Sequence, residues 1–189
     1  MAGEPETEAD AIRLQRQARK ERRAKQRIAS LDRAAKMHAA RLGPPTPEPV
    51  FRNLRRFHVG CSGWYYWHWH GIFYPESIPR SDWFKHYAEN FDTVELNAPF
   101  YSWPTIATVK TWIRQAANSP DFVYTVKVSD VITHVKQFVD TEELVLDFGY
   151  IADLLGPRFG CFLFQLPPSF SYTPERLSAI VGQLDPKRR

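Results

Sequence analysis

Cysteine is scarce in this sequence, and long apolar runs are missing. Cys61 and Cys161 are the only two cysteines in 189 residues and lie far apart, which argues against a disulfide framework and a cysteine-rich zinc site. No apolar run approaches the roughly 20 residues of a membrane-spanning helix. The opening residues, MAGEPETEAD, are acidic and lack the apolar stretch of a secretory signal. We therefore expect a globular, cytoplasmic protein without a membrane partner.

Glycine and proline are absent from residues 9–42, where Ala, Arg, Lys and Gln dominate. These residue types favour a helix. The apolar side chains form only a thin stripe at helical spacing, made of Ile28, Leu31, Ala35, His38 and Leu42. A helix with so narrow a stripe is expected to bury little surface. Two interpretations stay open: a solvated or disordered arm, or an arm that contacts RNA, DNA or an acidic surface.

Positive charge is concentrated in this arm. Residues 1–43 hold eleven Lys or Arg and six Asp or Glu, a net +5, whereas residues 44–189 hold fourteen and fifteen, a net −1. Any contact with nucleic acid is therefore expected from residues 1–43. The prolines that follow Gly43 indicate a stiff linker over residues 44–56. We place the folded domain at 57–189.

Strand and helix patterns alternate through this domain. Strands are predicted at 57–63, 93–101, 122–130 and 161–168, and helices at 81–91, 105–118, 141–156 and 173–184. We expect Ser81 or Asp82 to cap the first of these helices, and Thr173 to cap the last. Four successive βα units predict an α/β fold with a parallel sheet and helices outside it. The pattern fits a small open sheet or the front half of a larger barrel.

Polar residues gather where the predicted strands end. Side-chain alternation puts one set on the face opposite the helices: Ser62, Glu95, Asn97, Lys127 and Gln165. Carboxyl ends of neighbouring parallel strands are where barrel enzymes build active sites. Glu95 and Lys127 are therefore expected either to form an internal ion pair or to bind a ligand. His134 follows the third strand and is expected near the same edge.

The stretch WHWHG contains His68 and His70 with one residue between them. Two such histidines converge on a metal only in an extended strand, and this stretch follows the predicted first strand as a loop. We predict no metal site there. The aromatic residues are expected to form a loop over the strand ends, with Trp64 nearest the ligand.

Four segments, in order, carry a family resemblance: GCSGWYYWHWHGIFYPE, FDTVELNAPFY, FVYTVKVSDVITH and LFQLPPSF. They resemble the domain-of-unknown-function 72 family, also called YecE-like, over about residues 57–186, and leave the basic arm unmatched. The resemblance implies a TIM-barrel type fold of which 57–189 supplies the first four βα units. Such a half barrel would need a completing half from another chain, or would be an inactive fragment of a truncated gene.

The resemblance also implies site residues, although no established activity comes with it. By matching motif positions, Glu95, Lys127 and His134 are expected to be catalytic. The expected ligand-binding residues are Ser62, Trp64, Asn97, Tyr101 and Gln165. A divalent metal is expected only by analogy with metal-binding barrels. The leading hypothesis is an enzyme for a small polar or phosphorylated molecule, and the alternative is nucleic-acid association through the arm.

Overall fold

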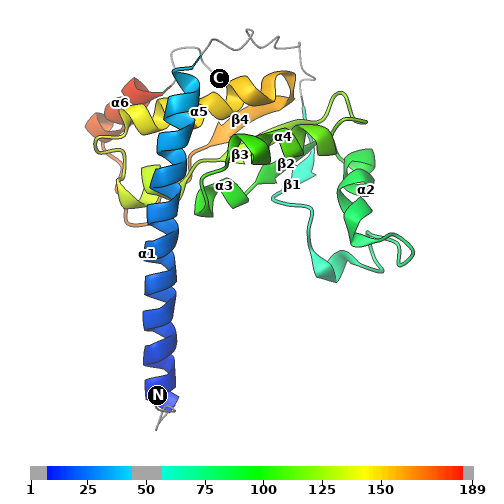
Figure 1. Ribbon diagram of the computed structural model, residues 1–189, viewed down its shortest axis with the longest axis horizontal. Coiled ribbons are helices and arrows are strands. Elements are labelled where there is room, and N and C mark those ends of the chain that lie inside the picture. The colour runs from blue at the N-terminus through cyan, green and yellow to red at the C-terminus, as the bar shows by residue number, and fades with distance from the viewer. Residues whose placement is uncertain (1–7, 44–56, 185–189) are drawn as a thin grey trace.

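The structure, a computed structural model, describes residues 8–43 and 57–184. The predicted proline-rich linker at 44–56 lies outside these residues. The described chain forms one long helix, α1 (Glu8–Arg41), and a four-stranded sheet with its flanking helices (Figure 1).

The sheet is parallel throughout, with strand order β1-β2-β3-β4. Its strands are β1 (Gly60–Cys61), β2 (Thr93–Leu96), β3 (Val123–Lys127) and β4 (Phe159–Leu163). The predicted α/β class with a parallel sheet is therefore confirmed. Gly60 is required where β1 meets β2, because a Cβ at this position would lie 1.9 Å from the carbonyl oxygen of Thr93.

Five further α-helices follow α1. They are α2 (Trp83–Asn90), α3 (Ala98–Tyr101), α4 (Ile106–Gln115), α5 (Glu142–Leu155) and α6 (Pro174–Gln183), and a π-helical turn, η3, spans Val131–Val135. Thr173 caps α6 as predicted, by accepting a hydrogen bond from the backbone N–H of Arg176. Asp82 is the N-cap residue of α2, one of the two positions predicted, but its side chain makes no capping hydrogen bond. Within the described ranges, no helix is long and apolar enough to cross a lipid bilayer.

All four predicted strands have different bounds in the structure, and at 93–101 and 161–168 the difference moves a predicted site residue off the sheet. The strand expected at 93–101 ends at Leu96, because Pro99 lies in the first turn of α3 and favours helix over strand there. The strand expected at 161–168 runs from Phe159 to Leu163. Its partner β3 ends at Lys127, the residue paired with Leu163, so the chain beyond has no strand beside it. Tyr101 and Gln165 therefore lie on a helix and a loop, at the carboxyl edge of the sheet.

The two faces of the sheet differ in burial. Val94, Tyr124 and Val126 are fully buried on the face covered by the helices, as strand alternation predicts. On the opposite face Val123 is buried, but Thr125 is half-buried and Cys161 is exposed. The hydrophobic core thus lies on the helix side of the sheet.

Helix α1 is docked through only part of its length. Its C-terminal half contacts α5 and η3, and its N-terminal half projects from the body (Figure 1). The apolar stripe of the sequence is not the face that docks, because Ile28 and Leu42 are 70% and 65% exposed. The buried positions are instead Ser30, Ala34 and Met37. This spacing of four and three residues places them on one helix face. That face packs against the body of the protein through small side chains and polar contacts.

Candidate ligand-binding site

A cavity of about 360 Å³ lies beyond the carboxyl ends of β3 and β4. Four residues predicted from the sequence line it: Tyr101, Lys127, His134 and Gln165. Its other lining residues are Arg23, Gln26, Arg27, Phe100 and Asp130. The structure therefore brings half of the predicted site residues together at the expected edge of the sheet.

Lys127 is the last residue of β3 and contacts an aromatic ring in this cavity. Its Nζ atom lies 4.6 Å from the centroid of Phe100, at a distance where the ring quadrupole attracts a cation. Among the described residues, no ion pair joins Lys127 to Glu95. The ammonium group is thus positioned by an aromatic face, and its charge is not neutralised by a bonded carboxylate.

His134 lies in η3 with a defined hydrogen-bond arrangement. Its Nδ1 atom is 2.9 Å from the Thr133 hydroxyl oxygen, which also lies 3.3 Å from the carbonyl oxygen of Ser129. The hydroxyl has one hydrogen for these two contacts, so Nδ1 donates to Thr133 in one tautomer of His134 and accepts from Thr133 in the other. Burial lowers the pKa of His134, the charge of Asp130 opposes this effect, and the charge of Lys127 adds to it. The imidazole is therefore predominantly neutral near pH 7, and its unprotonated ring nitrogen can accept a proton.

Asp130 and the α1 residues were not predicted for this site. Burial raises the pKa of the Asp130 carboxyl, and the charges of Arg27 and Arg23 offset this only in part. Asp130 precedes His134 by four residues, and Arg23 precedes Arg27 by four. Residues at this spacing share one side of a helix, which is the sequence signal for both pairs. For Asp130 the signal is hidden because this residue was expected to end the strand predicted at 122–130, whereas it is the N-cap residue of η3.

The remaining predicted residues lie outside the cavity. The Asn97 side chain donates a hydrogen bond to the carbonyl oxygen of Ser62 at 3.0 Å, which ties β2 to the segment after β1. The Trp64 ring packs edge-on against Phe84 with ring centroids 5.1 Å apart. Glu95 is half-buried on the sheet face away from the helices. None of these four predicted residues lines the cavity.

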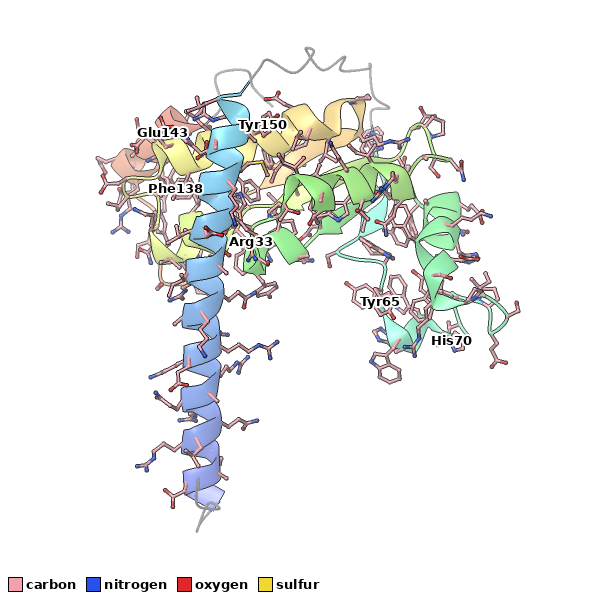
Figure 2. The ribbon with its side chains drawn as sticks, viewed as in Figure 1. Arg33, Tyr65, His70, Phe138, Glu143 and Tyr150 are labelled. Atoms are coloured by element: carbon pink, nitrogen blue, oxygen red, sulfur yellow. The ribbon has the colours of Figure 1, made fainter. Side chains whose placement is uncertain are left out.

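The aromatic loop packs beside α2. Trp67–Trp69 form a short 3-10 helix, and the His70 ring stacks on Trp83 at 5.9 Å. Figure 2 shows Tyr65 and His70 on the far side of the molecule from Arg33 of α1. The Tyr74 and Trp83 rings are stacked at 4.4 Å with an interplanar angle of 6°. The loop is thus packed against α2, and none of its residues lines the cavity.

A divalent metal does not fit the cavity. Among the described residues, Asp130 is its only carboxylate, and three cationic side chains, Arg23, Arg27 and Lys127, line the same space. Hard divalent cations need several oxygen ligands and are repelled by such charges. In the part of the chain that the structure describes, one group has ligand atoms close enough to share a metal: His38, Glu143 and Asp147. There the guanidinium group of Arg41 already donates hydrogen bonds to both carboxylates.

Comparison with known proteins places most of the chain in one family. Residues 58–189 match the family described as "Protein of unknown function DUF72". The chain belongs to the DUF72 family. This confirms the resemblance read from the four sequence segments, and the family match leaves α1 outside it.

Two DUF72 relatives show how much of the family's length the chain covers. The UPF0759 protein YecE of Escherichia coli K12 is 32% identical over 101 residues, which are 53% of this chain and 36% of YecE. The crystal structure of a DUF72 family protein from Thermotoga maritima is 30% identical, with a TM-score of 0.57. That match covers 67% of this chain and 52% of the other. The matched region thus spans less than two thirds of either relative.

Proposed function

We propose that this DUF72 protein binds a small anionic ligand, such as a phosphate ester, at the carboxyl ends of β3 and β4. The observation that carries the proposal is the meeting of Lys127, His134 and Gln165 around one cavity of about 360 Å³. An ammonium, an imidazole and an amide suit the oxygen atoms of a phosphate group. Parallel α/β sheets generally bind ligands at this end of the strands.

His134 adds chemistry to this binding site. In the tautomer with the proton on Nδ1, which then donates to the Thr133 hydroxyl, its Nε2 atom accepts a proton from a ligand hydroxyl or from water. Lys127 would stabilise the negative charge that such a transfer creates. Glu95, predicted as a catalytic residue, has no part in this proposal because it does not line the cavity.

Calorimetric titration with inorganic phosphate tests the binding proposal. Lys127→Ala should weaken phosphate binding by about 10- to 100-fold, which corresponds to the loss of a hydrogen bond between charged groups. Lys85→Ala is the matched control, because Lys85 is exposed on α2 and lies outside the cavity. If the wild-type protein binds neither phosphate nor pyrophosphate, or if both variants bind equally well, the proposal is wrong.

A second function, nucleic-acid association, is favoured by the projecting half of α1. Every side chain from Ala11 to Lys25 is exposed. Arg13, Arg16, Arg19 and Lys20 line a surface groove of about 430 Å³ on this half. A row of cations on a solvated helix suits the phosphate backbone of RNA or DNA.

Salt dependence tests the second function. Replacing Arg13, Arg16 and Arg19 with Ala should weaken binding of a single-stranded RNA oligomer. It should also reduce the slope of log affinity against log salt by about 0.7 for each RNA phosphate that the variant no longer neutralises. An unchanged slope would exclude the projecting half of α1 as a nucleic-acid surface.

We also propose that the four strands form half of a TIM-barrel type structure, which another half completes. All-parallel sheets almost always have both faces covered, whereas on the face away from the helices Thr125 is half-buried and Cys161 is exposed. Among the described residues, β1 and β4 each pair with one neighbour only. Size-exclusion chromatography with light scattering, combined with urea unfolding, tests this. A monomer that unfolds in one cooperative transition would contradict the need for a completing half.

A further inference from the structure

The anion cavity is bounded by a helix that the DUF72 match does not include. Residues 58–189 match the family, whereas Arg23, Gln26 and Arg27 of α1 line the cavity. Their spacing of three and one residues places all three on one side of the helix. One wall of the site is therefore supplied by the part of the chain that lies outside the family match.

Positive charge exceeds negative charge in the cavity. Arg23, Arg27 and Lys127 contribute three cations, and Asp130 contributes the single carboxylate. Within residues 8–43 and 57–184, neither arginine forms a salt bridge or a side-chain hydrogen bond. Both guanidinium forks are thus available for a ligand, and an arginine fork matches the geometry of phosphate oxygens.

The arginines are joined rigidly to the docked half of α1. Ser30, one turn beyond Arg27, is buried and accepts a hydrogen bond from the backbone N–H of Trp103 at 3.4 Å. Arg33 then donates to the Ser102 hydroxyl at 2.9 Å, beside α3 (Figure 2). A continuous helix transmits this docking to Arg23 and Arg27, so release of α1 removes both from the cavity.

We propose that α1 is a removable wall of the ligand site. Arg23 and Arg27 bind a phosphate group of a small molecule, together with Lys127, and the docking of α1 is coupled to ligand binding. This inference rests on the proposed anion-binding function. Coupling of this kind is reciprocal: a docked helix strengthens ligand binding, and bound ligand holds the helix in place.

Phosphate titration of a matched pair of double variants tests the assignment. Arg23→Ala with Arg27→Ala should weaken phosphate binding by about 100-fold or more, because two charged hydrogen-bond donors are removed. Arg22→Ala with Lys25→Ala is the control. Both of these residues are exposed, belong to the same stretch of α1, and lie outside the cavity. The control removes the same charge and should change the affinity by less than about threefold.

Hydrogen exchange tests the coupling. If α1 must undock before the amides of residues 30–41 exchange, phosphate at ten times its dissociation constant should slow their exchange about tenfold. At that phosphate concentration, the Arg23 and Arg27 double variant should show no slowing, and the control double variant should show the full effect.

The outcomes separate this inference from the function on which it rests. If Lys127→Ala weakens phosphate binding but the two double variants bind alike, the site stands and α1 is not its wall. If the wild-type protein binds no phosphate, the proposed function and this inference both fall. If an RNA oligomer binds and both double variants weaken it equally while phosphate is not bound, the helix is a general basic arm and the inference is wrong.

Discussion

Arg41 binds two carboxylates of α5 that differ sharply in burial, and this difference makes a quantitative prediction. Its Nε atom donates to Asp147 at 2.8 Å, and its Nη2 atom donates to Glu143 at 2.9 Å. The Asp147 side chain is 5% exposed, whereas that of Glu143 is 69% exposed. Asp147→Asn and Glu143→Gln each replace a carboxylate with an amide, one in the buried and one in the exposed environment.

Asp147→Asn should cost much more stability than Glu143→Gln. Removing one partner of a buried ion pair costs about 3–5 kcal/mol when the remaining charge is fully buried. Arg41 is 24% exposed and keeps its contact with Glu143, so we expect a smaller loss of about 2 kcal/mol for Asp147→Asn. Exposed pairs contribute little, and Glu143→Gln should cost about 0.5 kcal/mol.

Urea unfolding followed by circular dichroism measures both losses, and hydrogen exchange locates them. In Asp147→Asn, amides of residues 30–41 should exchange about 30-fold faster than in the wild type, the factor that corresponds to about 2 kcal/mol. In Glu143→Gln the same amides should change about twofold. Equal losses in the two variants, or a larger loss in Glu143→Gln, would refute the argument from burial.

Three further predictions concern the cavity and the sheet. Asp130→Asn should strengthen sulfate binding several-fold in calorimetry, because the only carboxylate of the cavity is removed; weaker binding would contradict this. Because the pKa of His134 is lowered, the imidazole gains its proton only below its ordinary value of about 6.5. Sulfate affinity should therefore rise as pH falls below that value, and His134→Gln should flatten the rise. The other charged groups facing the ring are Arg23, Arg27, Lys127 and Asp130. Gly60→Ala should lower the free energy of unfolding in urea by about 3 kcal/mol or more, since its Cβ would meet the Thr93 carbonyl oxygen. Gly182 lies in α6 with open space around it, so Gly182→Ala should instead raise the free energy of unfolding by about 0.5–1 kcal/mol.

Hydrophobic periodicity predicted the sheet and the edge at which the cavity lies. Alternation separated buried Tyr124 and Val126 from Lys127, and the carboxyl ends of parallel strands meet at one edge. This is why Lys127, His134 and Gln165 were expected together from the sequence. Local pattern is sufficient for such a prediction because neighbouring parallel strands repeat the same geometry.

The docking of α1 could not be predicted in the same way. Its buried face is made of Ser30, Ala34 and Met37, which carry little apolar signal, whereas the larger apolar residue Ile28 is exposed. One docking contact joins Arg41 to Asp147, 106 positions later in the chain. Pairing between charges so distant in sequence depends on the tertiary fold and leaves no local pattern. Without the docking of α1, nothing in the sequence placed Arg23 and Arg27 beside Lys127, and both were assigned to an arm rather than to a site.

The Ser30, Ala34 and Met37 face of α1 also affects how safely this helix can leave its seat. Two of these three side chains are small, and the Arg41 and Arg33 contacts beside them are charged groups that water solvates readily. A detached α1 would therefore expose no large apolar patch of its own, and such patches are what drive aggregation. If α1 undocks as proposed, this surface lets it leave and return without aggregating, as a reversible gate requires.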